Sequence, residues 1–239
     1  MSTARQIYKM KISSLIDHTP SVRELVLTPT EPQEFVFKAG QFVTLHVPQE
    51  PKPALRAYSI ASTDQSKNGF RLLFKHVPGG IASTYIWQVE EGQTLQFTGP
   101  FGRLLFREPP SQQIVFLNTG TGLSQHFSYL VSKKHLYPDL KYRLLFGVRN
   151  ESEIYYQAEL EKLSKELKDF KFEYVLSRPS ETWKGKKGYV QHFLPEFDYM
   201  NIDTTFYLCG NGGMIKEVKQ QLLEKDGFDK TKLFAEAFD

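Results

Sequence analysis

The run Pro53-Ala54-Leu55-Arg56-Ala57-Tyr58-Ser59-Ile60-Ala61-Ser62 is the stretch on which the interpretation of the whole chain depends. Its proline, aromatic and β-branched residues predict a short strand that begins close to Ala54. Since side chains two positions apart on a strand share a face, Arg56 and Tyr58 are expected to project together. A guanidinium beside a flat aromatic ring suits a nucleotide cofactor, which carries both phosphate and a planar ring system. Ser59 reaches the same ligand only if the strand twists or ends there.

The alternative interpretation is an ordinary barrel strand, with Tyr58 in the core and Arg56 in a surface ion pair. Short apolar runs on both sides of this stretch are separated by turn residues, at the spacing of a small antiparallel β-barrel. The expected strands cover Ile7–Ile12, Val22–Leu27, Gln41–Val47, Phe70–Val77 and Thr94–Thr98, with one helix at Ala82–Val89.

After about residue 110 the pattern changes to strands that alternate with helices, which predicts a parallel sheet with helical layers. Strands are expected at 114–117, 142–146, 170–176 and 206–209, and helices around 123–131, 160–167 and 214–222, while Leu233-Phe234-Ala235 closes the chain. The fold class is therefore two-domain: an antiparallel β-barrel at 1–106, followed by a parallel-sheet α/β domain at 107–239.

Composition narrows the possible functions. The 239 residues are 40% hydrophobic with a net charge of +3, which is too mild to indicate nucleic-acid binding. No apolar run approaches the roughly 20 residues of a membrane helix, and Met1–Gln6 lacks the apolar stretch of a signal peptide, so a cytoplasmic protein is expected. One cysteine, Cys209, excludes an internal disulfide and a cluster held by several cysteines of this chain. The six histidines show no metal-ligand spacing, and most are expected to be surface or half-buried residues without a special role.

Three glycine-containing turns are candidates for binding a nucleotide. Gly79-Gly80-Ile81-Ala82-Ser83-Thr84 lies between a barrel strand and the barrel helix, where backbone N–H groups and the Ser83 or Thr84 hydroxyl can meet a phosphate. Asn118-Thr119-Gly120-Thr121-Gly122-Leu123-Ser124 and Tyr207-Leu208-Cys209-Gly210-Asn211-Gly212-Gly213-Met214 each follow a parallel strand, the place where open α/β sheets bind ligands. Each turn alone is equally compatible with ordinary loop chemistry, and Cys209 with a small buried apolar residue.

The order of these signals along the chain resembles that of the ferredoxin–NADP reductase family, in which a flavin-binding barrel precedes a nicotinamide-binding α/β domain. The resemblance runs from about Ile7 to the C-terminus. It rests on five stretches in sequence order: Arg56-Ala57-Tyr58-Ser59, Gly80-Ile81-Ala82-Ser83, Gly99-Pro100-Phe101-Gly102, Gly120-Thr121-Gly122 and Cys209-Gly210.

For the barrel, the resemblance implies FAD as the cofactor. Tyr58 would stack on the flavin ring and Ser59 would hydrogen-bond near its N5 atom. Arg56 would hold the pyrophosphate together with the glycine turn. The implied FAD-binding residues are Arg56, Tyr58, Ser59, Ile60, Gly79, Gly80, Ile81, Ala82 and Ser83.

For the second domain, the resemblance implies that Gly120, Thr121 and Gly122, with Cys209 and Gly210, meet the nicotinamide nucleotide. Ser59, Cys209 and Glu236 are the implied catalytic residues. Phe238, in the ending Ala235-Glu236-Ala237-Phe238-Asp239, would cover the other flavin face where the family usually has a tyrosine.

Four further residues resemble the family's site for the 2′-phosphate: Ser177, Arg178, Lys187 and Tyr189. Cationic and hydroxyl donors suit that dianion, whereas a site for NAD would favour a carboxylate. NADPH is therefore the expected reductant, although the Ser-Arg-Pro sequence also occurs in relatives that use NADH.

The predicted function is that of a monomeric flavoenzyme, in which NADPH reduces FAD and electrons pass to ferredoxin, flavodoxin or a small-molecule acceptor. The chain carries too few cysteines for an iron–sulfur domain of its own. Two alternatives remain open: an NADH-dependent reductase of an oxygenase or of free flavin, and a non-catalytic FAD-holding electron-transfer subunit.

Overall fold

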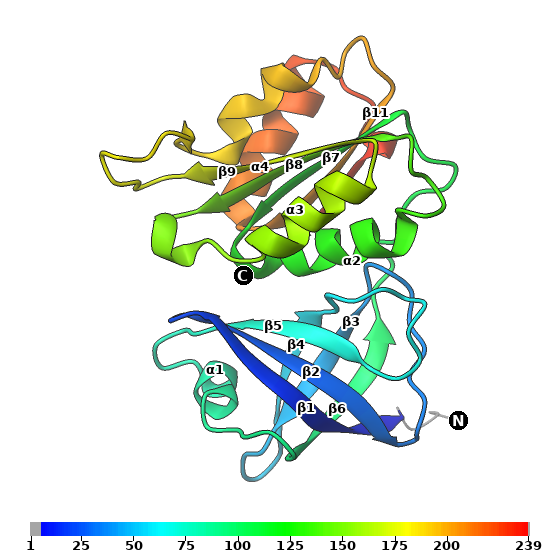
Figure 1. The fold of residues 1–239 in the computed structure, drawn as a ribbon, viewed down its shortest axis with the longest axis vertical. Helices are drawn as coiled ribbons and strands as arrows, with labels where there is room; N and C mark the ends of the chain where they lie inside the picture. The colour runs from blue at the N-terminus through cyan, green and yellow to red at the C-terminus, as the bar shows by residue number, and fades with distance from the viewer. Residues whose placement is uncertain (1–5, 239) are drawn as a thin grey trace. The chain divides into compact units, whose positions relative to one another are not determined.

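The computed structural model describes residues 6–238 and separates into two compact units (Figure 1). Unit 1 comprises Met1–Leu105 together with Phe127–Ser132, and unit 2 comprises Phe106–His126 together with Lys133–Asp239. Most of the N-terminal stretch Met1–Gln6, and Asp239, lie outside the described residues.

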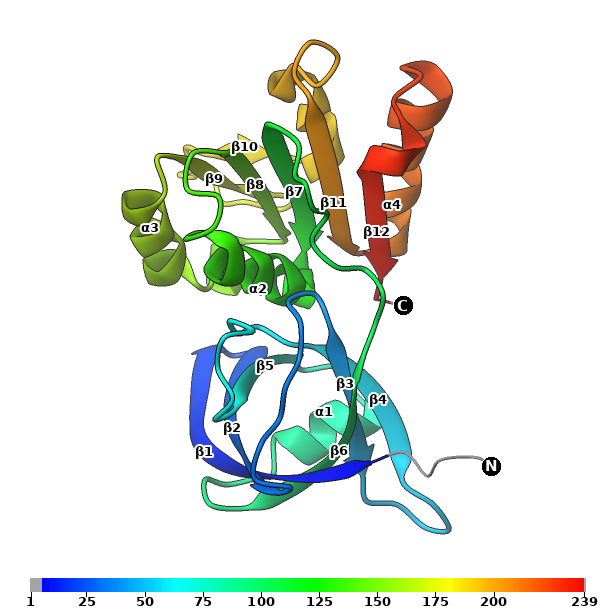
Figure 2. The ribbon, with the colours of Figure 1, turned by 90° about the vertical axis from the view of Figure 1, so that its right-hand side faces the viewer.

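Unit 1 is built on an antiparallel sheet of six strands in the order β4-β3-β6-β1-β2-β5. An isolated bridge between Ile60, just after β4, and Leu72 on β5 joins the two outer strands, so that the sheet curls into a barrel (Figure 2). The antiparallel barrel predicted from the sequence is confirmed. The elements are β1 (Ile7–Thr19), β2 (Val22–Glu31), β3 (Phe42–Val47), β4 (Ala54–Ser59), β5 (Phe70–Lys75), α1 (Ile81–Ile86) and β6 (Thr94–Phe101).

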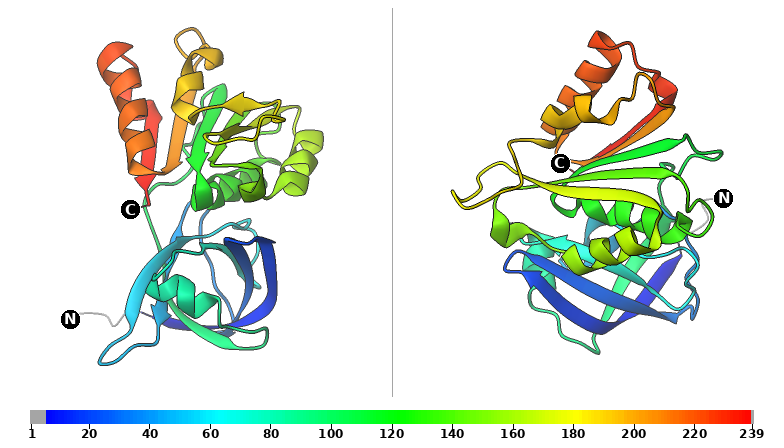
Figure 3. Two further views of the ribbon diagram at one scale, coloured as in Figure 1. Left: turned by 90° about the vertical axis from the view of Figure 1, so that its left-hand side faces the viewer. Right: turned by 45° about the horizontal axis from the view of Figure 1, so that its top comes forward.

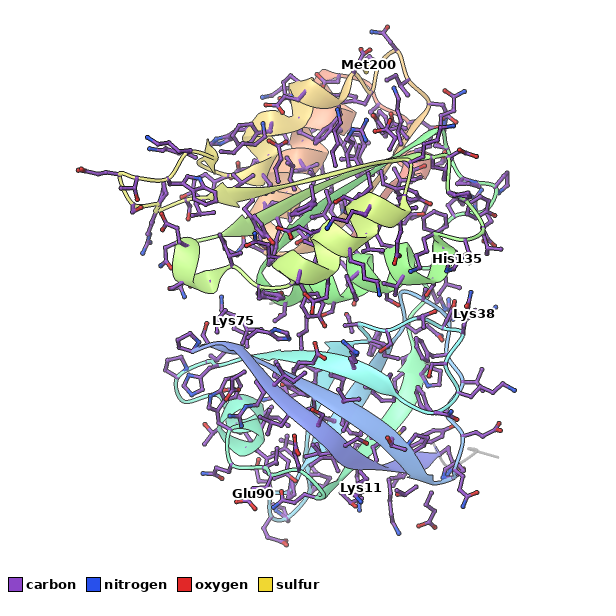
Figure 4. All side chains as sticks on the ribbon, viewed as in Figure 1. Lys11, Lys38, Lys75, Glu90, His135 and Met200 are labelled. Carbon is purple, nitrogen blue, oxygen red and sulfur yellow. The ribbon has the colours of Figure 1, made fainter. Side chains whose placement is uncertain are left out.

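The alternation of β3 explains how the barrel core forms. Val43, Leu45 and Val47 are buried, whereas the residues between them are partly exposed, as period-2 alternation requires. The short helix α1 contributes Ala82 and Ile86 to the same core. Figure 4 shows charged side chains such as Lys11 and Glu90 at the outside of this unit.

Unit 2 contains a six-stranded sheet in the order β10-β9-β8-β7-β11-β12, in which every pair is parallel. Helices α2 and α3 lie on one face and α4 on the other (Figure 3). The predicted α/β domain is confirmed. Its strands are β7 (Gln113–Thr119), β8 (Lys141–Val148), β9 (Asp169–Leu176), β10 (Lys186–Lys187), β11 (Thr204–Gly210) and β12 (Leu233–Ala237). Its helices are α3 (Gln157–Glu166) and α4 (Gly212–Lys219), with short helices at Gly120–Gly122, Glu151–Glu153, Val190–Phe197, Gln220–Lys225 and Lys230–Lys232. Helix α2 (Leu123–Lys133) begins and ends in unit 2, while its residues Phe127–Ser132 are grouped with unit 1.

The two faces of this sheet have different compositions. One face is aliphatic where Val115 and Leu208 pack with Val218 of α4. The opposite face carries large aromatic rings, among them Phe116 and Tyr207, whose ring centroids are 5.6 Å apart. Because side chains two positions apart share a face, this aromatic face continues into the polar residues at the strand ends, where the candidate site lies.

The sequence did not predict β10 or the 3-10 helix at Val190–Phe197. β10 contains only Lys186 and Lys187, and such a pair of lysines shows no apolar alternation that would reveal a strand. Within residues 6–238, no helix combines the length and the apolar character needed to cross a bilayer.

Candidate functional site

The strand β4 ends at Ser59, which meets the condition that the sequence set for that residue. Arg56 and Tyr58 lie opposite Leu45 and Val43 of β3, hence on one face of β4. The guanidinium of Arg56 is exposed and donates to the Leu55 carbonyl at 2.8 Å. Among the described residues it forms no ion pair, so the surface ion pair of the alternative interpretation is not found.

Tyr58 is half-buried and has two kinds of neighbour. Its ring centroid lies 4.3 Å from that of Phe74 in the barrel core. Burial raises the pKa of the Tyr58 phenol to about 12, and the positive charge of Arg56 opposes that shift. The Tyr58 hydroxyl therefore stays neutral, its ring packs against the barrel core, and its charge environment includes the Arg56 guanidinium.

The turn before α1 is held by the side chain of Ser83. Its hydroxyl donates to the Val77 carbonyl at 2.8 Å and accepts from the Val77 N–H at 3.1 Å, and Ser83 is buried. The Ser83 hydroxyl is thus already used inside the turn, while Thr84 is exposed. Because Thr84 N–H is bonded to the Gly80 carbonyl, the N–H groups of residues 81–83 precede the first intrahelical hydrogen bond.

In unit 2, the ends of β7 and β11 interlock at two glycines. A Cβ atom at Gly122 would overlap the Cys209 carbonyl, so only glycine allows this approach. Gly210 has φ +128°, and a Cβ there would overlap the Thr119 hydroxyl. That hydroxyl accepts from the Asn211 N–H at 2.8 Å. The structure therefore brings the predicted Gly120–Gly122 turn directly against Cys209 and Gly210.

Residues at the carboxyl ends of three neighbouring strands form one row. Asn118 on β7, Cys209 on β11 and Glu236 on β12 are register partners of one another in turn. Cys209 is completely buried, and burial together with the charge of Glu236 raises the pKa of its thiol. Cys209 is consequently a neutral thiol, both buried and next to the candidate nucleotide turn.

Glu236 is contacted by a residue that the sequence analysis missed. The side-chain amide of Gln125, the third residue of α2, donates to Glu236 Oε2 at 2.8 Å. Burial raises the pKa of the Glu236 carboxyl, and the hydrogen bond from Gln125 lowers it in part. No sequence signal marks Gln125, because its partner lies 111 positions further along the chain.

His126, the next residue of α2, is the one buried histidine among residues 6–238, whereas the other five are surface or half-buried as expected for most of them. His126 is fully buried against Phe116, with ring centroids 4.9 Å apart, and burial lowers its pKa to about 3. The Asn118 amide donates to His126 Nδ1 at 3.3 Å. Helical spacing from Leu123 and Leu130 would have indicated the burial of His126.

The four residues expected at a 2′-phosphate lie at or just beyond the ends of β9 and β10. Lys187 is the register partner of Leu176, which directly precedes Ser177 and Arg178. Arg178, Lys187 and Tyr189 are exposed, and Ser177 is partly exposed. The carboxylate of Glu151 is close enough to Lys187 for their charges to interact.

The remaining predicted residues also have defined positions. Gly120 accepts a hydrogen bond on its carbonyl from the buried Tyr155 hydroxyl at 2.9 Å, and Thr121 is partly exposed. Phe238 follows β12 and donates its N–H to the Gly210 carbonyl at 2.9 Å, with 37% of its surface exposed. Ile60 is buried, whereas Ile81 is 44% exposed at the glycine turn.

Both sets of residues fit a dinucleotide. In unit 1, the exposed guanidinium of Arg56 and the N–H groups at the start of α1 can donate hydrogen bonds to phosphate. The ring of Tyr58, which packs on Phe74, offers a flat surface on which a cofactor ring can stack. In unit 2 the glycine turn follows the central strand β7, where a side-chain-free backbone lets a nucleotide approach.

Comparisons with known proteins agree with this division. Residues 9–106 match the family model of the oxidoreductase FAD-binding domain, and residues 116–220 match that of the oxidoreductase NAD-binding domain. The chain is 33% identical over 229 residues to ferredoxin–NADP reductase B of Sorangium cellulosum (strain So ce56), with 92% of this chain and 93% of that protein covered.

Other similar proteins are longer or more distant. The chain is 28% identical to the glycine betaine monooxygenase reductase subunit of Pseudomonas aeruginosa (strain UCBPP-PA14), over 94% of this chain but only 62% of that protein. A crystal structure of a ferredoxin NADP+ reductase from Neisseria gonorrhoeae with bound FAD and NADP superposes with a TM-score of 0.81. It is 23% identical, with 98% of this chain and 99% of that chain covered, and so it supports the fold.

Proposed function

Because the chain belongs to the ferredoxin–NADP reductase family, as an NAD(P)H-dependent flavoprotein oxidoreductase with FAD-binding and NAD-binding domains, we propose that NADPH is its reductant and ferredoxin or flavodoxin its acceptor. The proposal assigns the FAD-binding function to residues 1–106 and the nicotinamide-binding function to 107–239. When bound together, these cofactors supply hydride transfer from the nicotinamide to the flavin and onward electron transfer.

In the proposed FAD site, Arg56 binds the pyrophosphate through its exposed guanidinium, and Tyr58 offers its ring for stacking. The N–H groups of Ile81 and Ala82 and the hydroxyl of Thr84 complete the phosphate contacts. The Ser83 hydroxyl instead holds the turn in shape through Val77. Ser59, at the strand end, is the proposed hydrogen-bonding group nearest the flavin.

In the proposed nicotinamide site, the backbone of Gly120–Gly122 binds the nucleotide while Cys209 lines the position next to the reacting carbon. As a neutral thiol, Cys209 excludes water without adding charge. Glu236, whose carboxyl pKa is raised by burial, holds or releases a proton at the same edge of the sheet. Phe238, which follows β12, would cover one face of the flavin.

The observation that carries the choice of NADPH is the pair of exposed cationic side chains at the ends of β9 and β10. Arg178 and Lys187, beside Ser177 and Tyr189, supply several donors for a dianion. A second candidate function, the NADH-dependent reductase of an oxygenase, is favoured by the similarity to the monooxygenase reductase subunit.

Anaerobic stopped-flow measurements of flavin bleaching test the proposal. Purified protein loaded with FAD is mixed with NADPH and, separately, with NADH over a range of concentrations. We expect NADPH to give at least a tenfold higher ratio of limiting rate to half-saturating concentration, the factor that corresponds to about 1.4 kcal/mol of differential binding. Equal or faster bleaching by NADH would support the oxygenase-reductase candidate.

The acceptor is tested with the reduced enzyme under the same conditions. Ferredoxin, flavodoxin and free flavin are supplied in turn, and reoxidation of the bound flavin is followed. Fast reoxidation by ferredoxin or flavodoxin, with slow reoxidation by free flavin, is the expected outcome. The reverse order would contradict the proposed acceptor.

A further inference from the structure

A side-chain hydrogen bond links α2 to β12: the neutral amide of Gln125 donates to the carboxyl of Glu236. Gln125 is fully buried, and its Nε2 lies 2.8 Å from Glu236 Oε2. The two residues come from opposite ends of unit 2 in sequence, so the contact exists only because α2 covers the face of the sheet on which Glu236 lies. A hydrogen bond to an ionised carboxylate is among the stronger ones in proteins.

The groups around Glu236 leave this amide as its principal polar support. Its register partner on β11 is Cys209, whose thiol is neutral and does not compensate a negative charge. His126, the nearest titratable residue along α2, is kept neutral by its burial. Within residues 6–238, no lysine, arginine or histidine forms an ion pair with Glu236.

We propose that Gln125 is a positioning residue, whose buried amide fixes one oxygen of the Glu236 carboxylate beside Cys209. A hydrogen bond from a neutral donor to the charged form stabilises that form, whereas burial of the carboxylate opposes it. Gln125 thereby sets the pH range over which Glu236 can hold or release a proton. This inference rests on the proposed function in so far as Glu236 is a catalytic residue.

The test measures the titration of the Glu236 carboxyl directly, by carbon-13 NMR of protein labelled at the glutamate side-chain carboxyl. The variant Glu236→Gln identifies the signal by its loss. In Gln125→Met, which keeps the side-chain length but removes the donor, we expect the titration midpoint to move to higher pH. At a fixed pH on the slope, the ratio of charged to neutral Glu236 should fall about tenfold.

A second Gln–Glu pair in the same unit provides a matched control. Gln191 Nε2 donates to Glu217 Oε2 at the same distance, 2.8 Å, on a surface formed by the 3-10 helix and α4. Gln191→Met makes the same chemical change and should leave the Glu236 midpoint unmoved. If Gln125→Met does not fold, Gln125→Asn retains the amide but shortens its reach, and the same upward shift is expected.

The outcomes separate this inference from the proposed function. An unchanged midpoint in the Gln125 variants would overturn the inference, even if NADPH bleaches the flavin normally. Failure of both nicotinamide nucleotides to bleach the flavin would overturn the proposed function, while the midpoints would still decide the role of Gln125. A shifted midpoint should be accompanied by a shifted pH profile of the limiting bleaching rate, with the half-saturating NADPH concentration changed less than about twofold.

Discussion

The two candidate binding regions are built in opposite ways. In the barrel, Arg56, Tyr58 and Ser59 are consecutive or nearly so along β4, and Arg56 is exposed and free of ion pairs within the described part of the chain. At the edge of the parallel sheet, Gly122, Cys209 and Glu236 come from three distant segments and are joined by tight or buried contacts. The first region is thus a local motif on one strand, whereas the second is assembled from segments that are distant in the sequence.

This difference determines how each region responds to substitution. The exposed side chain of Arg56 can be removed without disturbing the barrel, so its loss should appear in ligand binding alone. A residue in the assembled region also holds strands and helix together, so its loss should appear first in stability. Substitutions in both regions test this contrast, beginning with the largest expected effect.

Gly210→Ala should be the most damaging single change. Its φ of +128° is unfavourable for any residue with a Cβ, and that atom would overlap the Thr119 hydroxyl and backbone. We expect a loss of more than about 3 kcal/mol in the free energy of unfolding of unit 2. Trp183 reports this unit by fluorescence when Trp87, in the barrel, is replaced by phenylalanine.

Gly227→Ala is the matched control for this prediction. Gly227 also has a positive φ, +68°, but nothing lies within 4 Å of its added Cβ. It should therefore cost only about 1 kcal/mol, the conformational penalty without the overlap. Equal losses in the two variants would show that the interlocking of β7 and β11 contributes nothing specific.

The buried His126 predicts acid sensitivity of unit 2. The pKa of His126 is about 3 in the folded protein, against an ordinary value of 6.5 in the unfolded chain. Between these two pH values His126 is protonated in the unfolded chain but neutral in the folded protein. Stability is therefore complete above pH 6.5 and falls as the pH is lowered, by up to about 1.4 kcal/mol per pH unit. Urea unfolding of unit 2 between about pH 6.5 and 5 measures this slope.

The variant His126→Gln removes the titrating group and should flatten this slope, although it is less stable than the parent at neutral pH. His135, which is exposed on the same unit, serves as the control (Figure 4). His135→Gln should retain the steep dependence. A parent protein with no slope in this range would contradict the burial of a neutral imidazole.

The same contrast explains how far sequence reasoning reached. The strands and helices followed from apolar periodicity, and the glycine turns followed from their positions after the strands, because these signals are local. The contact of Gln125 with Glu236 depends on which helix face meets the sheet, so no local pattern contained the partner. The burial of His126, by contrast, follows the helical spacing from Leu123 to Leu130. The role of Ser83 was also hidden, since its hydroxyl turns inward to Val77 instead of outward.

Arg56→Ala should weaken FAD binding without destabilising the barrel. The side chain is exposed, and its hydrogen bond to the Leu55 carbonyl is local. Loss of a charge-assisted contact with the pyrophosphate should raise the dissociation constant for FAD about tenfold or more. Lys52→Ala, at another exposed cation close to the start of β4, should leave FAD affinity unchanged. A loss of barrel stability comparable to that of unit 2 in Gly210→Ala would remove the proposed contrast.

The smallest effects are expected at the residues that select the nicotinamide nucleotide. Arg178→Ala and Lys187→Ala should each lower the NADPH-to-NADH ratio of kcat/KM about fivefold to tenfold, because each removes one donor to a solvent-accessible phosphate. Lys184→Ala changes an exposed lysine of the same loop outside the four proposed residues and should leave the ratio unaltered.

Removing the charge of Glu151 should have the opposite effect and increase the preference for NADPH. The Glu151 carboxylate accepts hydrogen bonds from Ser180 and interacts with the charge of Lys187. The negative charge of Glu151 therefore offsets part of the attraction that Lys187 exerts on a phosphate. Glu151→Gln should therefore increase the preference for NADPH about twofold, and the increase should vanish when Lys187→Ala is also present, since the two substitutions then act on one interaction. Additive effects in the double variant would show that Glu151 acts through another group, and a parent ratio near one would show that this surface does not recognise a phosphate.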